Sequence, residues 1–134
     1  MKPVVISLIT VLSLLMISCF KLGKDQYYIK MTGAVEISHV EIPDTVISGN
    51  YALIKATAQA YDACWSNLTF KLDSTTNHEY TLQAMGTYES YGSCQSLMVY
   101  GDTAISLKMT KPGLYKFYTY MNPETTQIDT MIVR

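Results

Sequence analysis

Apolar and polar residues alternate along this chain from residue 34 onward, and this period of two limits its fold more than any other feature. The run 51–61 shows the pattern most clearly, because every second position from residue 54 is apolar: Ile54, Ala56, Ala58 and Ala60. The positions between them are polar. Successive side chains of a strand point to opposite faces, so we expect a strand with one buried and one solvated face.

Similar alternation recurs in short runs that turn-forming residues separate. The runs cover residues 35–42, 67–72, 80–84, 97–100, 105–109, 114–120 and 128–133. Gly, Pro, Asn, Asp and Ser gather between them, and no stretch has the period of a helix. The sequence therefore predicts one all-β domain over residues 34–134, an antiparallel β-sandwich of about seven or eight strands.

The first 18 residues have the layout of a bacterial signal peptide. A lysine precedes an apolar run over residues 4–17, and one small residue separates this run from Cys19. As a helix the run would reach only about 21 Å, whereas the hydrocarbon core of a bilayer is about 30 Å thick. We therefore expect residues 1–18 to be cleaved on export. The alternative is an uncleaved signal anchor with Lys21 and Lys24 as its stop-transfer flank.

Residues 16–19, Met-Ile-Ser-Cys, resemble a lipobox, the tetrapeptide that the lipoprotein signal peptidase cuts after a diacylglycerol is attached to the thiol. This resemblance implies that Cys19 becomes the lipidated first residue of the mature protein, with acyl chains such as palmitate as its membrane partner. Each buried methylene contributes about 0.8 kcal/mol, so two or three chains anchor a protein firmly. Phe20, rather than an aspartate, follows the cysteine, which favours the outer membrane. Residues 19–33 would then form a lipidated tether.

The cysteine count agrees with export. Lipidation uses Cys19 and leaves one pair, Cys64 and Cys94, for a disulfide in an oxidising compartment. Two free buried thiols are the alternative. We expect the disulfide, because a domain of this size gains a large share of its stability from such a bond.

The balanced charge and the scattered polar residues argue against several functions. The formal net charge is −1 and there is no basic stripe, so nucleic acid is not an expected partner. His39 and His78 lack the spacing of metal ligands and are expected as surface residues of strands. Glu36 and Glu41 are separated by five positions, which would place them on opposite faces of a strand. We therefore expect no metal, no cofactor and no catalytic activity.

Residues 113–117, Gly-Leu-Tyr-Lys-Phe, resemble the start of strand F in immunoglobulin-like domains. By this resemblance Tyr115 is a corner tyrosine, whose hydroxyl binds backbone near the preceding corner. Phe117 stands where antibody domains have their second cysteine, and Trp65 directly follows Cys64, so the core pin of antibody domains is absent. More broadly, the mature chain resembles small immunoglobulin-like envelope lipoproteins of Bacteroidetes-type bacteria, whose functions are largely unknown. The resemblance implies an immunoglobulin-like sandwich and an envelope location, and it transfers no site.

Four segments match the motif for O-glycosylation of exported proteins in such bacteria, which is Asp, then Ser or Thr, then an aliphatic residue, Met or Thr. The hydroxyl residues concerned are Thr45, Ser74, Thr103 and Thr130. Asp followed by Thr is also common where a turn leads into a strand, so a purely structural origin is an equal alternative.

Aromatic residues near the expected disulfide form the candidate binding patch. Its members are Tyr61, Trp65, Tyr88 and Tyr91. Aromatic side chains on loops that a disulfide joins can stack on sugar rings or contact a protein partner with little loss of conformational entropy. The alternative is that they cap one end of the core. Two functions follow: a non-catalytic interaction or structural module of the cell envelope, or a glycan-binding surface lipoprotein for nutrient capture.

Overall fold

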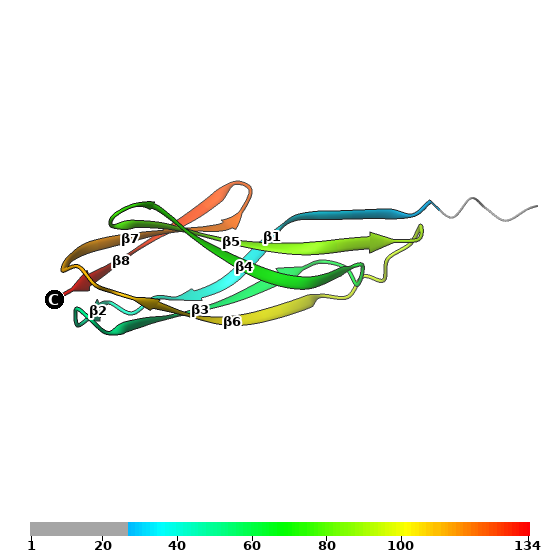
Figure 1. Cartoon of the computed structure of the whole chain (residues 1–134). Coiled ribbons are helices and arrows are strands. Elements are labelled where there is room, and N and C mark those ends of the chain that lie inside the picture. The colour runs from blue at the N-terminus through cyan, green and yellow to red at the C-terminus, as the bar shows by residue number, and fades with distance from the viewer. Residues whose placement is uncertain (1–26) are drawn as a thin grey trace, which may run out of the picture.

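A computed structural model describes residues 27–134 (Figure 1). The predicted signal peptide, the lipidation of Cys19 and the first part of the tether lie outside the described residues and stay predictions. Within 27–134 the chain forms eight strands: β1 (Ile29–Glu41), β2 (Thr45–Val46), β3 (Tyr51–Ala60), β4 (Trp65–Thr76), β5 (Glu79–Ser90), β6 (Val99–Lys108), β7 (Gly113–Asn122) and β8 (Thr125–Val133). No helix in this part of the chain is long and apolar enough to cross a bilayer. The all-β prediction is confirmed.

Strand β1 joins two layers of the fold. Its first part, up to Val35, pairs with β5, and from Glu36 onward it pairs with β3 instead. The strand order is β2-β8-β7-β5-β1-β3-β6, and β4 pairs with β5 outside this path. The sheet curls so that β6 and β4 approach each other (Figure 1). There Leu68 of β4 lies against Gly101 of β6, and no ladder joins the two strands. The result is a half-barrel rather than two separate sheets.

The inner face of the curled sheet holds the core. Among its fully buried side chains are Ile37, Ile54, Leu82, Phe117 and Met131. The alternation in the run 51–61 is confirmed, since the four apolar positions named above from residue 54 to residue 60 are all buried. Burial of this continuous apolar surface is the main stabilising term for the half-barrel.

Two pairings contradict the prediction of a purely antiparallel sandwich. β2 pairs parallel with β8, and β5 pairs parallel with β7. The second pairing follows from the path of β1, which leaves the edge of β5 at Val35. β7 then occupies that edge along Glu79 to Leu82, and its direction there is the same as that of β5. A mixed sheet results because one edge is shared between two strands.

The boundaries of two strands differ from the prediction. β1 begins at Ile29, inside the segment assigned to the tether, because β5 continues to Ser90 and offers partners to that segment. The polar residues 73–77 follow the predicted run 67–72 and are expected to form a turn. Instead, β4 continues through them to Thr76. Its partner residues on β5 carry the ladder to Glu79, so only two residues remain for the turn.

A bulge in β1 overturns the expectation for Glu36 and Glu41. The register shifts between Ile37 and His39, so Ser38 is an extra residue and the alternation changes phase. Both carboxylates therefore lie on the outer face. The two carboxylates still form no pair. Glu36 contacts Gln59 and Glu41 contacts Lys55, and these two partners are four positions apart on β3.

The Tyr115 hydroxyl donates a hydrogen bond to the carbonyl of Lys111, at 2.9 Å. The predicted backbone bond of this tyrosine is thus confirmed. Burial raises the pKa of Tyr115 above its usual value of 10.0, with a smaller contribution from Tyr80. His78 packs on the same ring, at 4.6 Å between centroids, and lies half-buried in the β4–β5 turn instead of on a strand surface.

Candidate binding site

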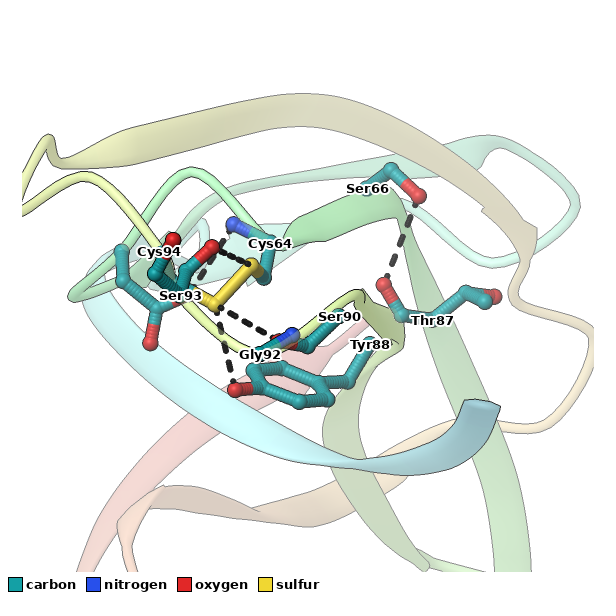
Figure 2. The surroundings of a disulfide bond; sticks show 9 residues. Cys64, Ser66, Thr87, Tyr88, Ser90, Gly92, Ser93 and Cys94 are labelled. Carbon is teal, nitrogen blue, oxygen red and sulfur yellow. Dashed lines mark hydrogen bonds between the residues drawn. A yellow bond between two sulfur atoms is a disulfide. The ribbon is translucent and has the colours of Figure 1, made fainter. Parts of the chain in front are cut away.

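The Cys64–Cys94 disulfide is present, as the cysteine count predicted, with 5.5 Å between the two Cα atoms. It ties the turn before β4 to the loop after β5 (Figure 2). Backbone bonds support this link, since Ala63 N donates to Gln95 O and Glu89 N donates to Cys64 O, both at 2.9 Å. The segment 61–65 is therefore held on both sides.

Tyr88 lies below the disulfide, and its hydroxyl donates to Cys94 Sγ at 3.2 Å (Figure 2). Its ring meets the indole of Trp65 edge-on, with centroids 5.3 Å apart and planes at 65°. A disulfide sulfur only accepts hydrogen bonds, so the tyrosine is the donor. The disulfide thus fixes Tyr88, and Tyr88 in turn orients Trp65.

A second bulge turns Trp65 toward the inside of the half-barrel. Asn67 has a φ of 49°, in the left-handed region that asparagine tolerates better than most residues. The β4–β5 register shifts between Ser66 and Thr69. Because of this shift, Trp65 and Leu68 both lie on the inner face, although they are three positions apart.

A groove of about 530 Å³ opens where β1 leaves β5 and β7 takes its place. Its walls come from β1, the end of β3, the middle of β5 and the β7–β8 turn. Most of its lining surface is apolar, and its polar and aromatic members are Glu36, Gln59, Tyr61, Asp62, Trp65, Gln83, Tyr120 and Asn122. We call this the Glu36 groove. Its volume is in the range of small-molecule sites.

Glu36 is the most strongly engaged polar residue of the groove. The Tyr61 hydroxyl and Gln59 Nε2 both donate to the same oxygen, Glu36 Oε2, the amide at 3.2 Å. No described residue forms a hydrogen bond with the other oxygen, Oε1. The bond to Glu36 raises the pKa of Tyr61 above its usual 10.0, and a little desolvation adds to this. Tyr61 and Gln59 therefore hold one carboxylate oxygen of Glu36 in place.

The charge of the Glu36 groove selects against anions. Glu36 and Asp62 are carboxylates, and no lysine or arginine of residues 27–134 lines the groove. Gln59, Gln83 and Asn122 add amide donors and acceptors. Carboxylates and amides beside aromatic walls suit hydroxyl groups or amines, and the two carboxylates repel phosphate or carboxylate ligands.

The structure brings only part of the predicted patch together. Tyr61 and Trp65 both line the Glu36 groove, and Tyr88 lies behind Trp65. Tyr91 does not line the groove. Its ring packs on that of Tyr28, with 4.8 Å between the two centroids. The patch is thus two aromatic sites: a groove in the middle of the domain and an exposed pair near its N-terminal end.

Sequence reasoning missed several groove residues. Glu36, Gln59, Gln83 and Asn122 come from four different strands or turns, which only the crossing of β1 brings together. Local alternation predicts that Glu36 and Gln59 face outward. It does not predict that β1 pairs with β3 at this point, so no local signal could have placed them side by side.

One cluster has the spacing of a metal site. Asp62, Cys64 and Cys94 offer ligand atoms within 4.8 Å of one another. Both sulfurs are bonded in the disulfide, so no thiolate is present to bind a metal. His39 is exposed and lies 3.3 Å from Glu41, in a surface pair.

The four candidate glycosylation residues differ in accessibility. Thr45, Ser74 and Thr130 are exposed, although the Ser74 hydroxyl also donates to Thr76 O at 2.8 Å. Thr103 is half-buried on the inner side of β6, opposite Ala56. A glycan fits the first three positions better than Thr103, and modification of all four stays a prediction.

Comparison of the chain with protein-family models, with curated proteins and with solved structures found no match.

Proposed function

We propose that this protein is a non-catalytic binding module of the cell envelope, anchored through an acylated Cys19, and that the Glu36 groove holds its ligand. One observation carries the proposal: Tyr61 and Gln59 hold one oxygen of Glu36 in a groove that the rings of Tyr61, Trp65 and Tyr120 also line. Binding sites typically combine apolar walls with a few oriented polar groups. No nucleophile with an adjacent base accompanies Glu36 among the residues that line the groove.

A glycan is the second candidate, and the lining of the groove favours it over a charged metabolite. Carboxylates and amides bind sugar hydroxyl groups, and aromatic rings pack on the apolar faces of sugars. A flat platform of coplanar rings is not formed, since the Trp65 and Tyr88 planes differ by 65°. Trp65 is half-buried, and its exposed part faces the groove. A sugar would therefore enter between the walls instead of lying on an open platform.

Fluorescence of Trp65, the only tryptophan, gives a direct binding assay. The probes are neutral oligosaccharides of glucose, mannose and xylose, with sialyllactose as an anionic comparison. We expect a saturable change with a neutral sugar and none with the anionic one. Glu36→Gln and Tyr61→Phe should each weaken binding, whereas Tyr51→Phe, which alters an exposed tyrosine outside the groove, should not. A panel without any saturable response would remove the glycan candidate.

Capture of envelope partners tests the broader proposal. The lipidated protein is purified from its native membranes after mild crosslinking, with Glu36→Gln as the matched variant. Partners recovered with the native groove and lost with Glu36→Gln would identify the groove as the interaction site. Recovery of the same partners with both proteins would contradict it.

The anchor has its own test. Cys19→Ala should abolish acylation and release the protein from membranes, which intact mass and membrane fractionation would show. Retention on the membrane without any loss of acyl mass would refute the lipoprotein assignment. The same spectra would show a glycan on Thr45, Ser74, Thr103 or Thr130.

The immunoglobulin-like character of the fold is part of the same proposal. We infer that the half-barrel is a curled form of an immunoglobulin-like sandwich, as in small envelope lipoproteins of Bacteroidetes-type bacteria. The bond from Tyr115 to the Lys111 carbonyl supports this, because it is the bond of a tyrosine corner. The change of partner in β1, which pairs with β5 up to Val35 and with β3 from Glu36 onward, supports it as well, because it divides the strands into two groups.

A further inference from the structure

Exposed aromatic residues gather at the end of the domain where the described chain begins. Tyr27 is 74% exposed, Tyr28 is 48% exposed and Tyr91 is 64% exposed. Tyr28 and Tyr91 pack against each other at 4.8 Å, just beyond the Ile29–Ser90 pair that ends the β1–β5 ladder. We call these three tyrosines the N-terminal tip.

The loop that follows Tyr91 adds an apolar side chain to this end of the molecule. Leu97 is 60% exposed, and the loop runs from the end of β5 to the start of β6 at the same end as the N-terminal strand (Figure 1). The C-terminus lies at the opposite end of the elongated domain (Figure 1). The N-terminal tip is thus the end of the domain to which the preceding chain is joined.

The length of the preceding chain limits where this surface can lie. Tyr27 follows Cys19 by eight positions, and eight fully extended residues reach at most about 28 Å. That distance is smaller than the thickness of a bilayer with its headgroups, about 40 Å. A domain anchored at Cys19 therefore keeps its N-terminal tip within about 28 Å of the lipid surface, close enough to reach it.

We propose that the N-terminal tip docks on the interfacial layer of the membrane, with Tyr27, Tyr28 and Tyr91 among the lipid headgroups. This rests on the proposed anchor at Cys19. Tyrosine suits the membrane interface because its ring is apolar and its hydroxyl can stay hydrated. Among residues 27–134, the ion pair of Lys30 with Glu89 follows the tip directly and is neutral overall, so it adds no net positive charge to attract anionic lipid.

Oxidative footprinting of the lipidated mature protein tests the docking. The protein is reconstituted into phosphatidylcholine vesicles, exposed to hydroxyl radicals and compared with the same protein in detergent-free buffer after Cys19→Ala. We expect severalfold lower labelling of Tyr27, Tyr28 and Tyr91 on vesicles. Tyr51, which is 62% exposed at the far end of β3, is the internal control and should label equally in both samples.

A matched pair of variants separates docking from anchoring. In Tyr91→Ser, labelling of Tyr28 on vesicles should rise to the level of the same variant in buffer, whereas in Tyr51→Ser it should stay severalfold lower on vesicles than in buffer. Both variants should float with vesicles, since the acyl chains hold them. Equal labelling of the tip with and without vesicles, in a protein that floats, would overturn the docking and leave the anchor intact.

Three other results would each contradict part of the docking proposal. A native protein that carries no acyl mass and does not float would refute the anchor itself. Protection that appears only on vesicles with phosphatidylglycerol would overturn the tyrosine mechanism in favour of charge attraction. Protection that is equal in the unlipidated protein and rises with its concentration would show a second copy of the chain on the tip instead of lipid.

Discussion

Gly33 and Gly86 are cross-strand partners in the β1–β5 ladder, and the indole of Trp65 occupies the space beside them that side chains would fill. A Cβ at Gly33 would lie 3.2 Å from the Trp65 ring, and one at Gly86 would lie 3.0 Å from it. Two facing glycines covered by an aromatic ring are a known device for packing a twisted sheet. The pair lets Trp65 lie close to the backbone and still reach the Glu36 groove.

Substitution of either glycine by alanine should destabilise the domain, but to different extents. At Gly86 a methyl group would lie 2.8 Å from Leu68 and 3.0 Å from Trp65, so both neighbours must shift. Overpacking of this kind costs roughly 1 to 3 kcal/mol. At Gly33 only the Trp65 ring is close, so Gly33→Ala should cost less. Urea unfolding of the two variants beside the native protein gives both values.

A double-mutant cycle isolates the contact with Trp65. Trp65→Leu removes the distal part of the indole that approaches Gly33. In that background we expect Gly33→Ala to be nearly neutral, whereas Gly86→Ala should keep most of its cost because Leu68 is unchanged. An equal cost of Gly33→Ala in both backgrounds would show that Trp65 is not the obstacle.

Removal of the disulfide by Cys64→Ala with Cys94→Ala should lower the free energy of unfolding by roughly 3 to 4 kcal/mol. The bond joins residues separated by 30 positions, and the chain-entropy relation gives this cost for a loop of that length. Urea unfolding measures it, with the native protein reduced by thiol as a second sample. A double variant as stable as the oxidised protein would contradict the prediction.

Local pattern and simple counting account for much of this structure. Alternation identified the buried face of β3 by residue, from Ile54 to Ala60, because the side-chain period of a strand is local. The Cys64–Cys94 bond followed from the number of cysteines left after Cys19. The hydroxyl bond of Tyr115 followed from a short motif. Each of these depends on a few neighbouring residues or on composition alone.

The Glu36 groove depends on the order of the strands, which alternation does not contain. β1 changes partner between Val35 and Glu36, and the bulge at Ser38 reverses the phase that a simple count assumes. The parallel neighbour of β5 is a consequence of that change. Asn67 has a similar effect on Trp65, since a single left-handed residue in β4 moves the indole inward. Pairing and phase are set by the whole sheet, so the site could not be assembled from sequence.

The ionisation of Tyr61 reports on the hydrogen bond that shapes the groove. Glu36 stabilises the neutral phenol, so Tyr61 should titrate above 10.0, and Glu36→Gln should lower its pKa toward that value. Because the folded-state pKa is raised, the bond stabilises the fold below pH 10 and this stabilisation is lost as the pH rises through the pKa of Tyr61. Carbon NMR of the tyrosine rings, assigned with Tyr61→Phe, measures the shift. A pKa of Tyr61 that Glu36→Gln does not change would contradict the bond.

Tyr115→Phe should destabilise the domain by about 1 kcal/mol, the usual net value of one hydrogen bond. The variant keeps the buried ring and its contact with His78, and it removes only the bond to the Lys111 carbonyl. Tyr80→Phe is the matched control, because the Tyr80 ring also packs in the core and its hydroxyl forms no hydrogen bond within residues 27–134. Thermal unfolding should separate the two, and equal effects would show that the corner bond contributes nothing.

Thr119→Val should stabilise the protein. The Thr119 side chain is fully buried on β7, and its hydroxyl has no hydrogen-bond partner among the described residues. An unsatisfied buried hydroxyl costs roughly 1 to 3 kcal/mol, and valine has nearly the same shape without that polar atom. We expect a gain of about 1 kcal/mol in urea unfolding. Thr57→Val is the control, since the Thr57 hydroxyl donates to Asp102 at 2.7 Å, and its loss should leave stability unchanged or lower. A loss of stability in Thr119→Val would mean that this hydroxyl forms a hydrogen bond in solution and would contradict the prediction.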